Sequence, residues 1–316
     1  MEIAFFTEGK PCNKVLRTYP NMRTDLAWIC ALDAKKCNLF QALDTTKDIH
    51  GVPSIDLGIV ILPKKNIDIL MRNSIDNLYT VCKKVAIMQE GPFWYFQDYS
   101  LDKQIYYFNS LVSADILFVH NEHDRKYYKG LTNHSDIRIL PSLMIEDSIG
   151  EIHTEDRSGI MIGGNMVSWY SGFDSFMLAS SVTDEIYSPK MGRAIDGEME
   201  LGIKQLPYLQ WKDWITELSK RKLGIHMMRT HAAGTFALNC SYLGIPCVGY
   251  KGLDTQRILH PALSVDDGDM ETARKLVNKL WNNLDFYKEN CILTKRLYKE
   301  KYSENIFKKT FYNGFQ

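Results

Sequence analysis

The stretch HMMRTHAAGTFALNCSYLGIPCVG, residues 226–249, decides how this chain is interpreted. It starts at the end of an apolar segment, crosses a turn of small residues at 232–235, and continues with apolar residues at helical spacing. Gly244 is expected to end that helix, and Pro246 to open a second apolar segment. The stretch therefore predicts strand, turn, helix, turn and strand, the unit from which parallel α/β sheets are built.

The small-residue turn also indicates a binding site. Ala233, Gly234 and Thr235 carry little bulk, so the free backbone N–H groups at the start of the helix can approach an anion such as a diphosphate. Many α/β crossovers have such a turn for packing alone. The turn therefore does not identify a ligand by itself.

Outside this stretch, short apolar segments alternate with longer amphipathic ones, which is typical of parallel strands joined by helices. We expect strands at 3–6, 57–62, 85–89, 116–120, 137–140, 159–162, 185–187, 223–227 and 246–249. We expect helices at 25–34, 67–82, 103–113, 122–130, 208–222, 234–243 and 270–283. Asn121 is the expected cap of the helix at 122–130. The fold class is α/β with two Rossmann-like domains.

The periodicity stops between 141 and 158, where charged residues accumulate, so we place a domain boundary there. Residues 1–150 are expected to form one Rossmann-like domain and 151–283 a second, each of about the usual domain size. Residues 284–316 are expected to form a lysine-rich helical tail, with a long helical segment from 285 to about 310. Two such domains facing a central cleft place ligands at the carboxyl ends of their strands.

The composition of the 316 residues limits the classes of function. No apolar run approaches the roughly 20 residues that span a membrane. Thirty-eight basic residues balance 38 acidic ones, so no overall charge attracts nucleic acid or an acidic membrane. Seven cysteines without CxxC spacing, and a start that lacks a secretory signal, predict a cytoplasmic protein.

The order of strand, small turn, helix, Gly-x-Pro and strand resembles the donor-binding signature of nucleotide-sugar glycosyltransferases of the two-Rossmann, or GT-B, type. The resemblance implies a nucleoside diphosphate sugar, and a UDP-sugar first, as co-substrate, with no tightly bound cofactor. In retaining members two glutamates eight positions apart flank the turn, near the transferred sugar and the ribose. His231 and Asn239 stand there; both can hydrogen-bond oxygens, but neither is a carboxylate.

Three further segments extend the likeness, in particular to the bacteriophage DNA α-glucosyltransferases, which modify hydroxymethylcytosine. These segments are VAIMQEG at 85–91, ADILFVHNE at 114–122 and GGNMVSWYSGF at 163–173. The resemblance implies that duplex DNA with a 5-hydroxymethylated pyrimidine is the acceptor partner. Such a base would have to leave the helical stack to enter a cleft.

The resemblance also assigns donor contacts. Gly163, Gly164 and Asn165 correspond to the opening of the family's second domain. The arginine and lysine that the family offers there are absent, so other cations must neutralise the diphosphate. The nearest candidates by sequence context are Lys190, Arg193 and Arg229.

Two carboxylates are candidate catalytic residues. Glu90 directly follows an apolar strand and precedes Gly-Pro, which turns the chain at the cleft edge, so it could orient an acceptor hydroxyl. A strand-end residue of this kind also caps helices or pairs with lysines. Asp25, at the start of a helix, ranks second because acids there are usually caps or dipole partners.

The remaining candidates belong to the acceptor side. A loop rich in glycine, proline and asparagine follows the first strand, and an aromatic cluster follows Glu90. Aromatic rings at a cleft mouth stack on sugars or flipped bases, but they are as often part of the core. The acceptor-side candidates are Gly9, Arg23, Gly91, Trp94 and Tyr95.

We expect no metal site. His120 and His123 are three positions apart but lack a nearby carboxylate pair, and no DxD motif ends a strand. Two rival functions stay open: a transferase of the same architecture that acts on a polysaccharide, lipid-linked sugar or protein, and a non-catalytic protein that binds sugar or nucleotide. The sequence leaves the sugar, the stereochemical outcome and the oligomeric state open.

Overall fold

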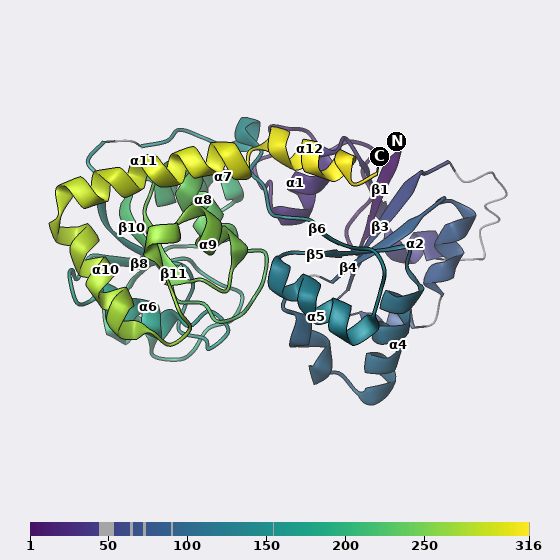
Figure 1. The fold of residues 1–316 in the computed structure, drawn as a ribbon, viewed down its shortest axis with the longest axis horizontal. Helices are drawn as coiled ribbons and strands as arrows, with labels where there is room; N and C mark the ends of the chain where they lie inside the picture. Colours follow the sequence, from purple (N-terminus) through teal and green to yellow (C-terminus); the bar gives the residue numbers. More distant parts are fainter. Residues whose placement is uncertain (44–53, 64–65, 72–73, 90, 154, 316) are drawn as a thin grey trace. The chain divides into compact units, whose positions relative to one another are not determined.

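The computed structural model describes residues 1–316 except 44–53, 64–65, 72–73, 90, 154 and 316. The chain divides into two compact units, one made of Met1–Arg17 and Asp25–Pro141, the other of Thr18–Thr24 and Ser142–Gln316. In the described residues each unit holds a six-stranded sheet in which all neighbouring strands are parallel (Figure 1). The predicted α/β class with two Rossmann-like sheets is confirmed.

The sheet of the first unit has the strand order β2-β1-β3-β4-β5-β6. The strands are β1 (Ile3–Thr7), β2 (Lys35–Asn38), β3 (Leu57–Leu62), β4 (Val85–Gln89), β5 (Ile116–Val119) and β6 (Ile137–Ile139). The helices are α1 (Thr24–Ala31), α2 (Leu39–Leu43), α3 (Ile67–Leu70), η1 (Ile75–Thr80), η2 (Phe93–Asp98), α4 (Leu101–Ser113) and α5 (Glu122–Thr132). Strands β1, β3, β4 and β5 are buried throughout, as continuous apolar strands of a parallel sheet should be.

Local hydrogen bonds explain where helices in this unit start. The side chain of Asn121 caps α5 as predicted, since it accepts a hydrogen bond from the Asp124 N–H at 2.9 Å. The prediction of one helix over 67–82 is wrong, because α3 and η1 are separate. Ser74 starts the second of them by accepting a hydrogen bond from the Asp76 N–H at 3.1 Å.

The sheet of the second unit has the order β12-β11-β10-β7-β8-β9. The strands are β7 (Ser158–Ile162), β8 (Ile186–Ser188), β9 (Lys204–Gln205), β10 (Arg221–His226), β11 (Cys247–Tyr250) and β12 (Ser264–Val265). The α-helices are α6 (Gly172–Ala179), α7 (Trp211–Ser219), α8 (Thr235–Leu243), α9 (Asp254–Leu259), α10 (Met270–Asn282), α11 (Leu284–Lys301) and α12 (Glu304–Asn313). Short 3-10 turns are η3 (Glu146–Ser148), η4 (Glu198–Leu201) and η5 (Pro261–Leu263).

The long helical segment expected in the tail consists of two helices. The tail forms α11 and α12, which are separated at Tyr302, and Ser303 takes up an extended backbone conformation. Helix α11 packs on α8 and α10 of the second unit (Figure 1). Its inner face carries Asn290, Thr294 and Tyr298, all buried.

A buried histidine ties α8 to its surroundings. The His260 ring contacts the Ala237 carbonyl oxygen of α8 through Nε2 at 2.9 Å, and its Nδ1 accepts a hydrogen bond from the Cys247 N–H at 3.3 Å. The Thr294 hydroxyl of α11 lies 3.1 Å from Nδ1. Burial lowers the pKa of His260 to about 4, so the ring is neutral and holds α8 in place at neutral pH.

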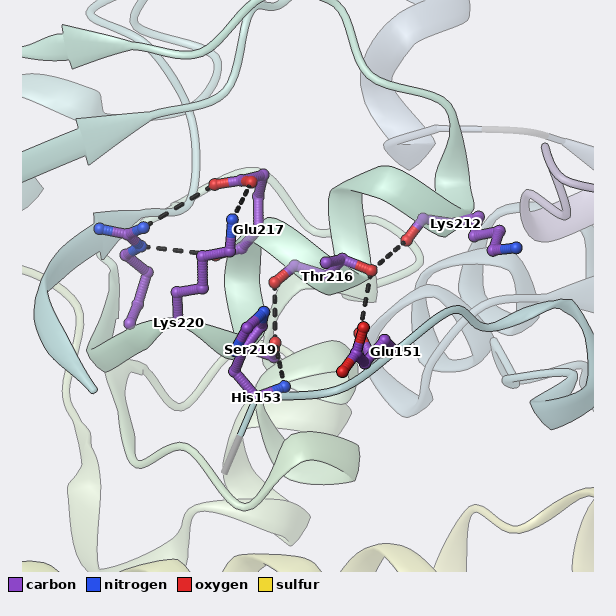
Figure 2. A network of polar contacts seen from close by, with 8 residues as sticks. Glu151, His153, Lys212, Thr216, Glu217, Ser219 and Lys220 are labelled. Atoms are coloured by element: carbon purple, nitrogen blue, oxygen red, sulfur yellow. Dashed lines mark hydrogen bonds and ion pairs between the residues drawn. The ribbon is translucent and has the colours of Figure 1, made fainter. Parts of the chain in front are cut away.

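Helix α7 is fixed by the segment of the second unit that precedes β7 (Figure 2). The Thr216 hydroxyl donates to the Glu151 carbonyl oxygen at 3.0 Å, and the His153 N–H donates to the Ser219 hydroxyl at 3.0 Å. An ion pair of 2.5 Å between Lys220 and Glu217 lies at the C-terminal end of the same helix. These contacts set the position of α7, whose opposite end faces the cavity described next.

Candidate functional site

The second unit contains a cavity of about 230 Å³ at the carboxyl ends of its strands. Residues that follow β7, β8 and β9 line it, together with the first turns of α7 and α8. The lining consists of Met22, Arg23, Thr24, Leu143, Gly163, Pro189, Lys190, Met191, Leu206, Pro207, Tyr208, Leu209, Trp211, Trp214, Thr235, Phe236, Leu238 and Asn239.

The strand order explains why the cavity forms here. The chain builds β7, β8 and β9 in one direction and then returns to place β10, β11 and β12 on the other side of β7. Connections therefore diverge above the gap between β7 and β10, which is the point where ligands bind in doubly wound sheets. Gly163 leaves β7 at this point, and α8 begins after β10.

Gly163 is required by close packing. A Cβ atom there would lie 2.3 Å from His226 Cδ2, so no larger residue fits without moving the ring. The His226 ring meets Phe236 edge to face, with centroids 5.2 Å apart, and burial lowers its pKa to about 4. His226 is therefore a neutral packing residue beneath the cavity.

The N-terminus of α8 is open toward a ligand. Gly234 precedes the helix with φ of +65°, and no side chain caps the first turn among the described residues. The Thr255 hydroxyl donates to the Gly234 carbonyl oxygen at 2.8 Å, and Ser142 donates to the Ala233 carbonyl oxygen at 2.9 Å. The turn is thus held through its carbonyl groups, which leaves the N–H groups of α8 for an anion.

Two buried polar atoms among the lining residues have no hydrogen-bond partner in the described structure. They are Asn239 Oδ1, on the second turn of α8, and Trp211 Nε1, on α7. A buried unpaired donor or acceptor costs about 1–3 kcal/mol, so such atoms are rare unless a ligand or water satisfies them. The cavity is therefore equipped for a molecule that offers both hydrogen-bond donors and acceptors.

The predicted donor residues after β7 form a scaffold. Asn165 is buried, and its amide donates to the Arg193 carbonyl oxygen. Glu198 accepts hydrogen bonds from the N–H groups of Met166 at 3.0 Å and Ile195 at 3.2 Å. Together they hold the loop after β8, which carries Lys190 into the cavity lining.

The other candidates around this loop are packing contacts. A Cβ on Gly164 would lie 2.4 Å from the Tyr170 side chain. The Arg193 guanidinium lies over the Trp169 ring, 4.5 Å from its centroid. The His231 ring lies against Gly252, where a Cβ would come within 2.4 Å of Nε2. None of these three residues belongs to the cavity lining.

Arg229 is already neutralised by acids. Its guanidinium pairs with Asp174 at 3.2 Å and with Asp267 at 3.3 Å. The hydrogen bond with Tyr250, and then the two aspartates, raise the pKa of Arg229 further. Of the three cations predicted for the diphosphate, Lys190 is the one that lines the cavity.

The structure divides the acceptor-side candidates between the two units. Gly9 follows β1, Gly91 follows β4 with φ of 96°, and Trp94 and Tyr95 are half-buried in η2. Asp25 lies in the first turn of α1, half-buried. Arg23 belongs to the second unit, and Glu90 lies outside the described residues.

Sequence reasoning missed Glu8. In the first unit, connections diverge between β1 and β3, and Glu8 follows β1 at that point. Its carboxylate accepts a hydrogen bond from the Asn66 amide at 2.5 Å, and Asn38 donates to the Gly9 carbonyl oxygen at 3.2 Å. The signal was present, because Glu8 follows an apolar strand as directly as Glu90 does.

In the described part of the chain, no group of three or more histidine, cysteine, aspartate or glutamate side chains could hold a metal ion. No described helix combines the length and apolarity needed to cross a membrane.

No protein-family model and no curated protein matches this sequence. Solved structures match in fold. HepE from Anabaena, in complex with UDP and glucose, is 8% identical with a TM-score of 0.66; the match covers 100% of this chain and 99% of the HepE chain. Sucrose-phosphate synthase from Thermosynechococcus elongatus is 10% identical with a TM-score of 0.64; the match covers 89% of this chain and 83% of the synthase chain.

TarM from S. aureus, in a complex that includes UDP, is 11% identical with a TM-score of 0.64 over 82% of this chain. The present chain spans about half of the TarM chain, 55% of its length. At such identities the likeness concerns the fold, and the chain has the GT-B fold of two Rossmann-like domains.

Proposed function

We propose that the protein is a glycosyltransferase that moves a sugar from a nucleoside diphosphate donor, a UDP-sugar, to an acceptor hydroxyl. The observation that carries this proposal is the cavity at the divergence point of the second sheet, beside the uncapped N-terminus of α8. Structural neighbours of the same fold, HepE and TarM, were solved with UDP. The lining combines a helix N-terminus, a lysine, an asparagine and aromatic rings, which together suit a nucleoside diphosphate.

Each part of a nucleoside diphosphate donor has a counterpart among the residues that line the cavity. The diphosphate fits the first turn of α8 at Thr235, where the helix dipole and free N–H groups favour negative charge. Asn239 lies one turn further along α8, and its unpaired Oδ1 can accept a hydrogen bond from a ribose hydroxyl. The aromatic lining residues Tyr208, Trp211 and Trp214 suit a planar base.

The reaction breaks the bond between the anomeric carbon and the diphosphate oxygen and forms a bond from that carbon to the acceptor oxygen. Negative charge grows on the departing diphosphate, and the α8 N-terminus with Lys190 is placed to stabilise it. The acceptor hydroxyl loses its proton to a base or to the departing phosphate. Glu90, Asp25 and Glu8 are the proposed carboxylates on the acceptor side. Retention of configuration is proposed on the sequence resemblance alone.

For the acceptor, we propose a 5-hydroxymethylated pyrimidine in DNA, supported by the resemblance at 85–91, 114–122 and 163–173. The zero net charge weighs against DNA, because phosphate contacts require basic residues. A glycan, lipid-linked sugar or protein acceptor is the alternative within the same reaction. All seven cysteines are free, which fits the proposed cytoplasmic location.

The test is to incubate the protein with a pool of nucleotide sugars and duplex DNA that contains cytosine or 5-hydroxymethylcytosine. Mass spectrometry of the released nucleosides should show a sugar increment on the hydroxymethylated base alone. Donor hydrolysis without an increment would retain the transferase and reject the DNA acceptor. If no donor is consumed with any acceptor class, the transferase proposal fails and a binding protein is favoured.

A further inference from the structure

A short segment from the first half of the chain is built into the cavity. We call residues 18–24 the strap; they lead into α1, whose first residue is Thr24, but belong to the second unit. The Pro20 carbonyl oxygen accepts a hydrogen bond from the Lys212 N–H at 3.0 Å, and Asn21 Oδ1 accepts one from the Trp211 N–H at 3.2 Å. Helix α7 has no side-chain cap from Gln210, so the strap satisfies its first N–H groups.

These contacts fix the side chain of Arg23. Its Nε donates to Asn21 Oδ1 at 2.9 Å, and its Nη2 donates to the Leu209 carbonyl oxygen at 3.1 Å. The guanidinium carbon lies 5.0 Å from the centroid of the Tyr208 ring. An arginine held at three points has lost most of its side-chain freedom before a ligand arrives, so a further contact costs little conformational entropy.

The charge of Arg23 is not balanced by these partners. Asn21, Leu209 and Tyr208 offer neutral groups, and Arg23 forms no ion pair among the described residues. Only Arg23 and Lys190 are cationic in the described cavity lining. Arg229 is neutralised by two aspartates, and Arg193 lies over Trp169 away from the lining.

We infer, on the basis of the proposed function, that Arg23 is a donor-binding residue whose guanidinium pairs with the phosphate oxygens of the nucleoside diphosphate. A diphosphate brings at least two negative charges into a cavity that the α8 N-terminus and Lys190 compensate only in part. The remaining N–H groups of the guanidinium fork suit a phosphate, which presents several acceptor oxygens in a compact group. The donor site thus depends on a residue about 140 positions away from β7.

The test compares UDP with uridine on the full-length protein by calorimetry or ligand-observed NMR. Arg23→Gln should weaken UDP binding about tenfold, the loss expected for a charge-assisted pair, and leave uridine binding within about twofold. The salt dependence of UDP binding should also become shallower. Arg23→Lys keeps the charge but loses the guanidinium fork. Its affinity for UDP should therefore lie between that of the unaltered protein and that of Arg23→Gln.

Lys212→Gln is the matched control, because it removes one positive charge from an exposed residue of α7 outside the cavity lining. Thermal unfolding of each variant checks the fold, and Arg23→Lys serves if Arg23→Gln is unstable. Unchanged UDP affinity in the Arg23 variants, or an equal loss for UDP and uridine, would overturn the inference and leave the proposed function standing. Failure of the unaltered protein to bind any nucleoside diphosphate would reject both.

Discussion

Thr255 holds the turn before α8 by donating its hydroxyl hydrogen to the Gly234 carbonyl oxygen at 2.8 Å. The same hydroxyl oxygen would lie 2.1 Å from a Cβ placed on Gly234, whose φ is +65°. The position of the Thr255 hydroxyl therefore limits the residue type that fits at position 234. Glycine is required at 234 both by the left-handed backbone and by the proximity of the threonine.

Gly234→Ala should reduce both stability and donor affinity. The left-handed conformation costs an L-residue about 1–2 kcal/mol, and the clash with Thr255 adds to it, so we expect a loss of about 2–4 kcal/mol in unfolding free energy. Denaturant unfolding measures the loss. The turn should also shift and weaken UDP binding by at least about tenfold, as calorimetry would show.

Gly268→Ala provides the control for that change. Gly268 has φ of +82°, but no atom lies within 4 Å of the position its Cβ would occupy. This variant should therefore show the conformational cost alone, with donor affinity unchanged. Equal effects of the two substitutions on UDP binding would contradict the role assigned to the Gly234 turn.

Asn239→Ala should weaken UDP binding about tenfold while the thermal unfolding temperature changes little. The reason is that Asn239 Oδ1 lacks a partner in the described structure, so its removal sacrifices a contact with the ligand rather than one within the fold. Asn278→Ala, at a half-buried position of α10 outside the cavity lining, is the control. A large loss of stability with unchanged affinity would show that Asn239 serves packing instead.

Glu198→Ala should raise the KM for the donor several-fold. Glu198 is buried and accepts hydrogen bonds from two backbone N–H groups, and these fix the loop that follows β8. Without it, Lys190 should be held less firmly, which lowers binding more than it lowers kcat. Steady-state kinetics separates the two. A change confined to kcat would contradict this positioning role.

The two buried histidines make the fold sensitive to acid. Burial lowers the pKa of both His226 and His260 to about 4, below the ordinary 6.5 of the unfolded chain. The unfolded state therefore binds protons first. The stabilisation that the two neutral histidines give the folded state is complete above about pH 6.5 and is lost as the pH falls from there through about 4. At pH 5.5, protonation of each histidine in the unfolded state should lower the free energy of unfolding by about 1.4 kcal/mol relative to neutral pH.

Denaturant unfolding at several values of pH between 7 and 4.5 checks this expectation. His260→Gln should flatten the dependence, because the variant has one titrating group fewer. Its stability at pH 7 should also fall, since the contacts to Ala237 and Cys247 are disturbed. An unchanged slope in that variant would show that His260 is not neutral in the folded protein.

The central strands could be predicted because burial on both faces demands continuous apolar sequence. LGIVIL at 57–62 and VAIMQ at 85–89 were placed with their observed bounds. Strands β2, β9 and β12 were missed. They lie at sheet edges, are two to four residues long and need no apolar run.

The site was predictable where local chemistry creates it. The small residues at 232–235 predict the open N-terminus of α8. The left-handed backbone at position 234 and the close approach of Thr255 require glycine there. The strap was not predictable, because Pro20 and Asn21 cap a helix about 190 residues later. Sequence proximity to α1 predicts Arg23 on the acceptor side, and it carries no information about the long-range partners of Arg23 in the second unit.

The most direct test of the central claim is a calorimetric titration of UDP into the protein. The account predicts one saturable site per chain with a dissociation constant below about 1 mM, which a UDP-sugar competes for and Asn239→Ala weakens. Absence of saturable binding for UDP, and equally for ADP, GDP, CDP and dTDP at millimolar concentrations, would contradict it. The cavity of the second unit would then not be a nucleotide site.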